Sequence, residues 1–475
     1  MKTAEITVKK KVRWSDGHPV TAKDLEYSYE IIANPKVKTS RYVSSLENIK
    51  GIAAYHAGKA KNISGIEMPD GPNGRRIILH FFELRPAMLS AGNVFFWDYA
   101  APYHYLKNIP FDKLVSSPQI RKHPLFFGPY KMDSTVQGQA TTWSRNPYYW
   151  QGKPNFEHIQ MSTISTSSAS QAIKSRKFDV ANVINMQYAQ VKNTKGINII
   201  GNKSTLYSYL SFKVGKWNEN TGKNEQYKHA KMDNPALRKA MAYGMNVDQV
   251  DQRIFHSLRY RVNSLIPAQF GAYHDKNIPA YSYNPAKANK LLDQAGYKKD
   301  KKTGYRLQPN GKKLTINLAV PASSSSAASL WTNYIQQWKK LGLKVRFYTG
   351  RPMEFNNWVN AVKASDPGID VLSNAWEPTG DPSPTVLYGK KMPYNAGRFV
   401  SPTNNKLLSE IDSKKSFDTN YRIQKMHEWQ RWMYDKAYVV LLSGTYSLVA
   451  LDSKLIGWSL KPSANVWFEA GFSKK

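Results

Sequence analysis

The chain has 475 residues, a formal net charge of +34 and no cysteine. The absence of cysteine excludes thiolate nucleophiles, disulfides and cysteine-based zinc sites. A hydrophobic content of 41% is typical of a globular protein, and a chain of this length exceeds a single core, so we expect two or three domains.

The positive charge has two interpretations. Nucleic-acid binding needs clustered lysine and arginine, whereas here the basic residues form short, dispersed groups such as Lys9–Lys11 and Lys298–Lys302. We therefore favour a solvated surface held near anionic envelope polymers or lipid headgroups, and we do not expect nucleic acid to be a partner.

The segment 12–35 predicts a strand, a turn and a helix in succession. Val12 and Trp14 alternate with charged residues, as at the end of a half-buried strand, and Ser15-Asp16-Gly17 is typical of a turn. Thr21 and Asp24 have the spacing of a capping box at the start of a helix. The apolar face of this helix is predicted to contain Ala22, Leu25, Tyr29 and Ile32.

Further along, two regions predict β-structure. Residues 66–82 form two β-rich runs separated by Asp-Gly and Asn-Gly pairs, which predicts a hairpin. The runs at 159–164 and 178–180, with a serine-rich loop and a short helix between them, predict a strand–helix–strand unit. A longer unit of the same kind is predicted from 314 to 372, and together these two units suggest two α/β lobes.

The second half of the chain contains clear helix starts and ends. Asn234-Pro235 and Asn284-Pro285 each predict the start of a helix, and Gly342 ends the helix at 330–340. A long helix is predicted around Ile423–Met433, followed by two strands at 438–442 and 446–451.

Several of these motifs resemble one known family. They are W-S-D-G-x-P-V-T-A-x-D at 14–24, Gly-Pro-Tyr at 128–130, N-P-x-Y-W at 146–150, the segment 233–248, and Y-N-P-x-K-A-x-x-L-L-x-x-A-G-Y at 283–297. In this order they resemble the extracellular solute-binding proteins of family 5, which include the oligopeptide-binding proteins of bacterial ABC importers. The resemblance extends from Val12 to about Trp458.

The resemblance implies a bilobal α/β fold of the periplasmic-binding-protein-like type II (cluster C) class, with a hinge between the lobes and an extra small domain. We expect residues 1–101 to form this α+β domain, with an incomplete N-terminus. Lobe I would comprise 102–206 and 446–475, and lobe II would comprise 207–445. The implied function is capture of an extended peptide, through its backbone and hydrated side-chain pockets, and delivery to the membrane permease.

The segment that best matches the family's binding region is Ser373–Glu377, at the end of a predicted strand. Asn374 and Ala375 would offer a strand edge to the peptide, and Trp376 would form the wall of a side-chain pocket; core packing is the alternative for Trp376. Relatives have an aspartate shortly afterwards that binds the peptide's α-ammonium group, but here Thr379 or a neighbour has that position. The carboxylates available are Glu377 and Asp381, and Asp381 with Pro382 is also compatible with a turn.

Other positions carried over from the family are Tyr42, Asn182, and Tyr207 or Tyr209, for each of which a packed aromatic residue or a capped turn is the alternative. Ser373 stands where some relatives have an arginine that binds a short peptide's carboxylate. The loss of this arginine and of the fixed aspartate favours longer peptides held in a variable register.

The chain has no motif of an enzyme. It lacks G-x-x-x-x-G-K-[ST] and G-x-S-x-G, and His427-Glu428 has no second histidine at helical spacing. With its ten histidines scattered, we expect no catalytic residue, no metal site and no cofactor. The expected partners are an oligopeptide and an ABC permease, and the expected state is a monomer. The alternatives are a protein of the same fold that binds signalling peptides or oligosaccharides, and a basic protein that binds envelope polymers or other polyanions.

The N-terminus differs from the resembled family. Met1-Lys2-Thr3 leads directly into the strand-like run Glu5–Val8, without an apolar leader or a lipobox cysteine. We expect this chain to be an N-terminally truncated form. The full-length form would be lipid-anchored at the extracellular face of the cytoplasmic membrane.

Overall fold

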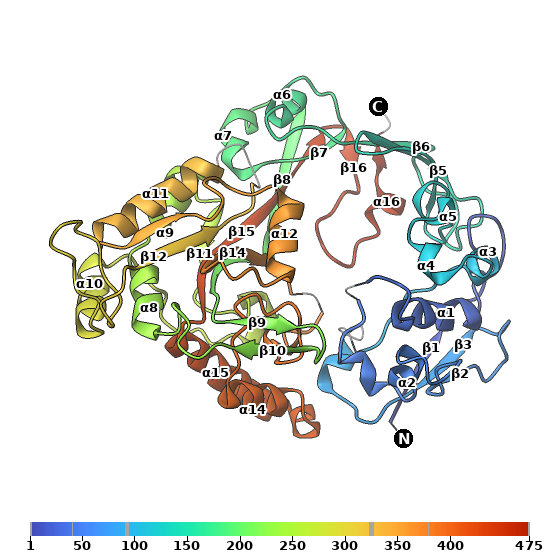
Figure 1. Cartoon of the computed structure of the whole chain (residues 1–475). Helices are drawn as coiled ribbons and strands as arrows, with labels where there is room; N and C mark the ends of the chain where they lie inside the picture. Colours follow the sequence, from blue (N-terminus) through green and yellow to red (C-terminus); the bar gives the residue numbers. More distant parts are fainter. Residues whose placement is uncertain (1, 40, 91–94, 323–326, 379, 474–475) are drawn as a thin grey trace. The chain divides into compact units, whose positions relative to one another are not determined.

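The computed structural model describes residues 2–39, 41–90, 95–322, 327–378 and 380–473 (Figure 1). Within these ranges, every helix is too short or too polar to cross a lipid bilayer. The chain divides into two compact units, which are described separately below.

Each of the two units is built from segments that are not contiguous in the sequence. Unit 1 consists of 1–181, 193–200 and 450–475, and unit 2 consists of 182–192 and 201–449. The main crossings, at 200/201 and 449/450, lie within the long strands β8 (Ile197–Phe212) and β15 (Val439–Asp452). The predicted crossings, 206/207 and 445/446, lie in the same two strands. The separation of residues 1–101 as a further domain stays a prediction.

Unit 1 consists of small sheets and short helices. Its elements are β1 (Thr3–Thr7), α1 (Ala22–Ala33), η1 (Leu46–Asn48), α2 (Ile52–His56), β2 (Ile66–Glu67), β3 (Arg76–His80), η2 (Pro86–Leu89), α3 (Tyr103–Leu106), α4 (Phe111–Leu114), α5 (Pro118–Arg121), β4 (Tyr130–Val136), β5 (Ala140–Arg145), β6 (His158–Ser162), α6 (Ala169–Lys174), β16 (Leu455–Ile456), α16 (Val466–Glu469) and β17 (Gly471–Phe472). The sheets have the orders β1-β3-β2, β4-β5-β6 and β16-β17.

The predicted helix at the start of the chain is confirmed. Thr21 caps α1, since its side chain accepts a hydrogen bond from the Asp24 backbone and the Asp24 carboxylate accepts one from the Thr21 backbone. The predicted apolar face is largely buried, because Ala22, Leu25 and Tyr29 are all at most 4% exposed. The predicted hairpin is confirmed by the antiparallel pairing of β2 with β3.

One prediction in unit 1 is wrong and another is confirmed only in part. Val12–Trp14 is not a strand: Arg13 only bridges Pro19, because the chain turns back after Gly17, whose φ is +93°. The strand, helix and strand predicted at 159–180 are present, but they do not form one α/β unit. β6 belongs to the β4-β5-β6 sheet, whereas β7 (Val180–Asn182) pairs with β15, so sequence proximity did not determine their partners.

Unit 2 is built around most of a seven-stranded sheet, with the order β11-β15-β8-β14-β12-β13 and β7 paired to β15. Its other elements are η3 (Asn185–Gln187), α7 (Tyr188–Val191), β9 (Gly215–Asn218), β10 (Lys223–Gln226), α8 (Pro235–Tyr243), α9 (Val247–Arg253), β11 (Arg259–Arg261), η4 (Ala268–Tyr273), α10 (Pro285–Gln294), β12 (Thr315–Ala319), α11 (Ala327–Lys340), β13 (Lys344–Phe347), α12 (Phe355–Lys363), β14 (Val371–Trp376), α13 (Thr385–Tyr388), α14 (Pro402–Ile411), η5 (Lys414–Phe417) and α15 (Thr419–Lys436).

The predicted α/β unit from 314 to 372 is confirmed. β12 pairs in parallel with β13 and with β14, and α11 and α12 provide the two crossovers (Figure 1). Trp331 and Trp338 of α11 are buried in the same core as Ile316 and Leu318 of β12. These packed helices fix the position of β14, the strand that contains the predicted binding segment.

The other predictions for unit 2 have mixed outcomes. Asn234 and Asn284 cap α8 and α10, as their sequences indicate, by accepting backbone hydrogen bonds from Ala236 and Lys287. The long helix near the end is confirmed as α15. The two strands predicted at 438–451 form the single 14-residue strand β15. Gly444 does not interrupt this strand, because β15 is paired at that residue with Tyr260 of β11.

Candidate functional site

The predicted binding segment lies on β14 in unit 2, in register with β8. Trp376 pairs with Tyr207, Ala375 with Ser208 and Asn374 with Tyr209. The structure therefore brings five of the predicted site residues onto two neighbouring antiparallel strands.

One side of β14 lacks a strand partner along this segment. β12, the neighbour on the side away from β8, pairs only with Val371 and Leu372. Within the part of the chain that the structure describes, no strand pairs with this side of residues 373–376. A strand edge of this kind has backbone groups available for an added strand.

Aromatic side chains lie at the end of this edge. Trp376 is partly buried, and its ring centroid lies 6.1 Å from that of Tyr394. Ala375, the residue before it, is exposed, so the backbone here has no large side chain covering it. An open edge beside a half-buried aromatic pair can accept a peptide backbone and pack against one of its side chains.

Glu377 is held against β8 just after this edge. Its Oε1 accepts hydrogen bonds from Ser204 Oγ at 2.8 Å and from Thr205 Oγ1 at 3.5 Å. The Ser204 carbonyl in turn accepts a hydrogen bond from the Gln269 side chain at 2.8 Å. Two hydroxyl groups of β8 thus orient the carboxylate of Glu377 at the end of this edge.

Tyr207 and Tyr209 are buried, each only 3% exposed, and their ring centroids lie 5.6 Å apart. Burial raises the pKa of Tyr209 well above its usual range, and it also raises the pKa of Tyr207. Both tyrosines pack in the main core of unit 2. The structure therefore shows them supporting β14 from the core, and their predicted contact with ligand stays a prediction.

Asp381 has a structural partner. Its two carboxylate oxygens accept hydrogen bonds from Arg422 Nη1 and Nη2 at 2.7 and 2.8 Å, and Oδ1 also accepts one from the Ser383 backbone at 2.8 Å. The Asp381 and Arg422 side chains are only 3% and 4% exposed. A charged ligand amine would have to replace a buried bidentate ion pair to bind here. The role of Asp381 as an anchor for a ligand stays a prediction.

A second carboxylate completes this buried group. Asp412 Oδ1 lies 3.9 Å from Arg422 Nη2 and accepts a hydrogen bond from Ser383 Oγ at 2.8 Å. Burial raises the pKa of Asp412 above its usual value. Burial alone would lower the pKa of Arg422, but the hydrogen bonds to Asp381 raise it overall. The charge of the arginine is thus balanced inside the protein by Asp381.

The remaining candidates lie elsewhere. Tyr42 belongs to unit 1, where its ring stacks on His56 with a centroid separation of 3.8 Å. Asn182 is exposed at the end of β7. Thr379 lies outside the described residues. The predicted roles of Tyr42 and Asn182 in ligand binding stay predictions.

Sequence analysis missed three residues that shape this region: Tyr394, Ser204 and Arg422. Tyr394 follows Pro393 in an irregular segment, Ser204 lies in the middle of β8, and Arg422 lies one turn inside α15. None belongs to a motif with the β14 segment. Only knowledge of the strand pairing and of the helix packing could have connected them to it.

An open-sided strand on a mixed α/β sheet, with half-buried aromatic side chains beside it, can bind an extended ligand as an added strand. Structural comparison places the fold among the bilobal solute-binding proteins. Lactococcal OppA, complexed with an endogenous peptide in the closed conformation, is similar with a TM-score of 0.94 and 38% identity, over 99% of this chain and 88% of that one. AppA from Bacillus subtilis, in complex with a nonapeptide, has a TM-score of 0.80 at 18% identity, over 100% and 88% of the two chains, and supports the fold alone.

Sequence comparison gives the family. Residues 1–397 match the bacterial extracellular solute-binding proteins, family 5 Middle, and the chain belongs to this family. The oligopeptide-binding protein OppA of Lactococcus lactis subsp. lactis is 38% identical over 478 residues, which cover 99% of this chain and 79% of that protein. The predicted family and the predicted bilobal fold are confirmed. The family consists of extracellular solute-binding proteins, a class defined by binding rather than by catalysis.

Proposed function

We propose that this chain is the substrate-binding component of an oligopeptide ABC importer, which captures extended peptides and delivers them to a membrane permease. The observation that carries the proposal is the unpaired side of β14 along residues 373–376, beside Trp376 and Tyr394. A relative named as an oligopeptide-binding protein, 38% identical over 99% of the chain, supports the same ligand class.

In the proposed complex, the peptide adds to β14 as a further strand. Backbone hydrogen bonds would supply affinity independent of sequence, and Trp376 would pack against one peptide side chain. Because Arg422 pairs with both oxygens of Asp381, a peptide's N-terminus would bind this carboxylate only by displacing Arg422, which supports binding of longer peptides in a variable register. The proposed ligand-binding residues are Trp376, Glu377, Asp381, Asn374, Ala375, Tyr42, Asn182, Tyr207 and Tyr209.

The proposal includes three features supported by the family resemblance alone. They are the absence of catalytic activity, a monomeric state, and attachment to the membrane by a lipid anchor. Delivery of a ligand to a permease requires none of the reactive groups that an enzyme needs, and the family's class as solute-binding proteins agrees with this.

The first experiment is native mass spectrometry of the purified protein, followed by release and sequencing of whatever is bound. A heterogeneous set of peptides, with one predominant length range, is the expected result. Detection of a bound oligosaccharide would contradict the proposal, because it would show that the ligand is not a peptide. An empty protein that also shows no thermal shift with a mixed peptide library, but binds heparin with a steep salt dependence, would favour the polyanion-binding alternative.

A second experiment tests the added-strand geometry. Peptides N-methylated at alternate positions should lose at least tenfold in affinity, because they cannot donate the backbone hydrogen bonds, whereas alanine substitution of most peptide side chains should change affinity less. Trp376→Ala should weaken binding, while Trp217→Ala, a half-buried tryptophan on β9 in the same unit, should not. Full affinity of the N-methylated peptides would refute pairing with β14.

A further inference from the structure

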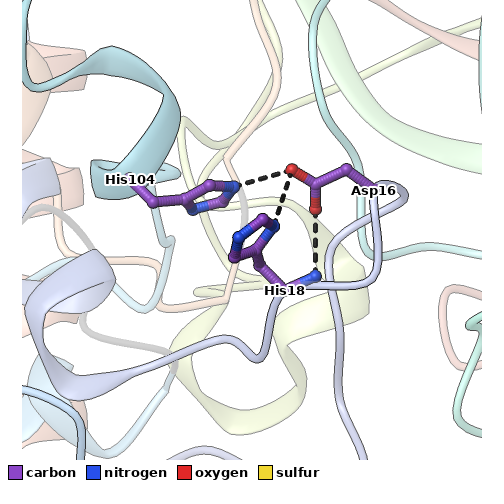
Figure 2. Close-up of side chains that lie close together, drawn as sticks. All are labelled: Asp16, His18 and His104. Carbon is purple, nitrogen blue, oxygen red and sulfur yellow. Dashed lines mark hydrogen bonds and ion pairs between the residues drawn. The ribbon is translucent and has the colours of Figure 1, made fainter.

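Three potential metal ligands converge on the surface of unit 1. The Asp16 Oδ2 atom lies 3.1 Å from His18 Nδ1 and 2.7 Å from His104 Nε2 (Figure 2). The three ligand atoms all lie within 4.8 Å of one another. We propose that Asp16, His18 and His104 form a binding site for one divalent transition-metal ion of the Zn²⁺ type. This site is additional to peptide binding, and the scattered histidines of the sequence had led us to expect no metal.

The donor set fits this class of ion. Two imidazole nitrogens and one carboxylate oxygen are ligands that Zn²⁺ prefers, whereas Mg²⁺ and Ca²⁺ prefer oxygen ligands alone. Bond lengths of about 2.0–2.1 Å at tetrahedral angles put ligand atoms about 3.3–3.4 Å apart. To reach this spacing, the present separations from Oδ2, 3.1 Å to His18 and 2.7 Å to His104, need to open by about 0.2–0.3 Å and about 0.6–0.7 Å. Small side-chain rotations supply this, because the His18 side chain is 60% exposed and Asp16 30%.

The two segments that carry the ligands are held together independently of any ion. Buried Asp24 accepts a hydrogen bond from Trp14 Nε1 at 3.0 Å, just before the Asp16 turn. It also accepts one from the Tyr103 backbone at 2.8 Å, directly before His104. The same carboxylate caps α1. The turn and α3 therefore share one fixed anchor, and the ligands are positioned before an ion arrives, which lowers the entropic cost of binding.

The Asp16 carboxylate is itself oriented for this role. Its other oxygen, Oδ1, accepts a hydrogen bond from the His18 backbone at 3.1 Å, which leaves Oδ2 directed at both rings (Figure 2). Oδ2 is therefore the oxygen that a cation shared by the two imidazoles would meet.

The two imidazole rings lie side by side at the proposed site. The His18 and His104 rings are stacked, with centroids 4.1 Å apart and an angle of 23° between their planes. His18 Nδ1 and His104 Nε2 donate to Asp16 Oδ2 in the metal-free protein, and in the other neutral tautomers, with the proton on His18 Nε2 and His104 Nδ1, they direct lone pairs at one cation. Among the described residues, the other nitrogens, His18 Nε2 and His104 Nδ1, have no hydrogen-bond partner. The usual support for zinc-ligating histidines is thus lacking, so we expect affinity on the order of micromolar rather than nanomolar.

The test is a titration of the metal-free protein with ZnCl₂ by isothermal calorimetry, after treatment with a chelator and its removal. We expect one ion per chain, and a d–d absorption band of low-symmetry coordination when Co²⁺ replaces Zn²⁺. His18→Gln and His104→Gln should each weaken Zn²⁺ binding at least tenfold, because each removes one of only three ligands. Melting temperatures of the two variants without metal should stay close to that of the wild type, since both histidines lie at the surface.

The matched control is His80→Gln. His80 Nε2 lies 3.0 Å from Glu67 Oε2 in the same unit, as a single histidine–carboxylate pair without a second imidazole. This variant should bind Zn²⁺ as the wild type does. The proposal is overturned if the wild type binds no stoichiometric Zn²⁺ at tens of micromolar, or if His18→Gln and His104→Gln bind as tightly as His80→Gln. In that case the cluster only connects the turn to α3. Peptide affinity should be unchanged in His18→Gln, which separates this proposal from the transport function.

Discussion

The Asp381–Arg422–Asp412 group of unit 2 and the Asp16–His18–His104 group of unit 1 both combine carboxylates with nitrogen-containing side chains, but they differ in burial. In unit 2 the three side chains are at most 4% exposed, and Asp381 is bound at both oxygens by Arg422. In unit 1 the exposed fractions are 27–60%, and the two imidazoles share a single carboxylate oxygen.

This difference in burial separates a structural role from a binding role. Removal of a partner from the buried group leaves a charge without water, so the group is committed to the fold. In the exposed group water replaces any lost partner, so the same kinds of atoms can exchange partners with an incoming ion. From the sequence, Asp381 was predicted to bind ligand, whereas Asp16 was predicted only to form a turn. Their burial favours the reverse, because Asp381 is buried in an ion pair and Asp16 is partly exposed to solvent.

The largest effect should come from Arg422→Met. This change leaves Asp381 and Asp412 buried near each other without a cation, and we expect a loss of about 3–5 kcal/mol in the free energy of unfolding, measured by urea denaturation at pH 7. The control is Lys425→Met on the same helix, whose partners Glu428 and Glu410 are 37% and 25% exposed, with an expected loss below about 1 kcal/mol. Equal losses in the two variants would contradict the assigned importance of burial.

An intermediate effect on the free energy of unfolding should come from the titration of Asp251, a buried carboxylate. It accepts hydrogen bonds from Ser443 Oγ at 2.7 and 2.9 Å, and burial raises its pKa to about 6. Because the folded state then holds the proton more tightly than the unfolded state, the stabilising contribution is present below about pH 4 and is lost as the pH rises through 6. As the pH rises through this range, the free energy of unfolding should fall by about 2–3 kcal/mol.

The variant Asp251→Asn should remove this pH dependence. Compared with the wild type, its free energy of unfolding should change less between pH 4 and pH 7, as measured by denaturant titration at each pH. Asp248→Asn, which changes a carboxylate that is 57% exposed on the same helix, should leave the wild-type pH profile in place. A wild-type profile in Asp251→Asn would show that the proton binds elsewhere.

The smallest effect should come from Asp16→Asn without metal. The lowered pKa of Asp16 means that its stabilising contribution is present at neutral pH and is lost as the pH falls through that pKa. Because the group is partly exposed, the loss at pH 7 should be below about 1 kcal/mol. A double-mutant cycle with His104→Gln should give a coupling energy in the same range. A coupling above about 2 kcal/mol would mean that this cluster is as structural as the Asp381 group.

The candidate site was partly predictable from the sequence. The segment 373–377 was identified from its resemblance to a family, and the α/β unit that carries it was predicted from hydrophobic periodicity and from helix ends such as Gly342. Its pairing with Tyr207 and Tyr209 was not predictable, because register between strands separated by more than 160 residues depends on packing of both faces of the sheet. The same reason explains why the two strands predicted at 438–442 and 446–451 form one strand, β15, which is paired with β11 at Gly444.

By itself, the sequence determined the features that depend on near neighbours. Thr21 and Asp24 determine the start of α1, and Asn234 and Asn284 determine the starts of α8 and α10, because each hydrogen bond in these caps joins residues two or three positions apart. The order of the family motifs also established the class of protein.

The tertiary structure alone decided which distant side chains meet. It placed His104 beside Asp16, 88 positions earlier in the chain, and it placed Arg422 on Asp381. Among the residues that the structure describes, it also left one side of β14 without a strand partner beyond Leu372. These contacts depend on how whole elements pack. Burial determines which side chains a charged group can pair with and how much free energy its desolvation costs, and the local sequence determines neither.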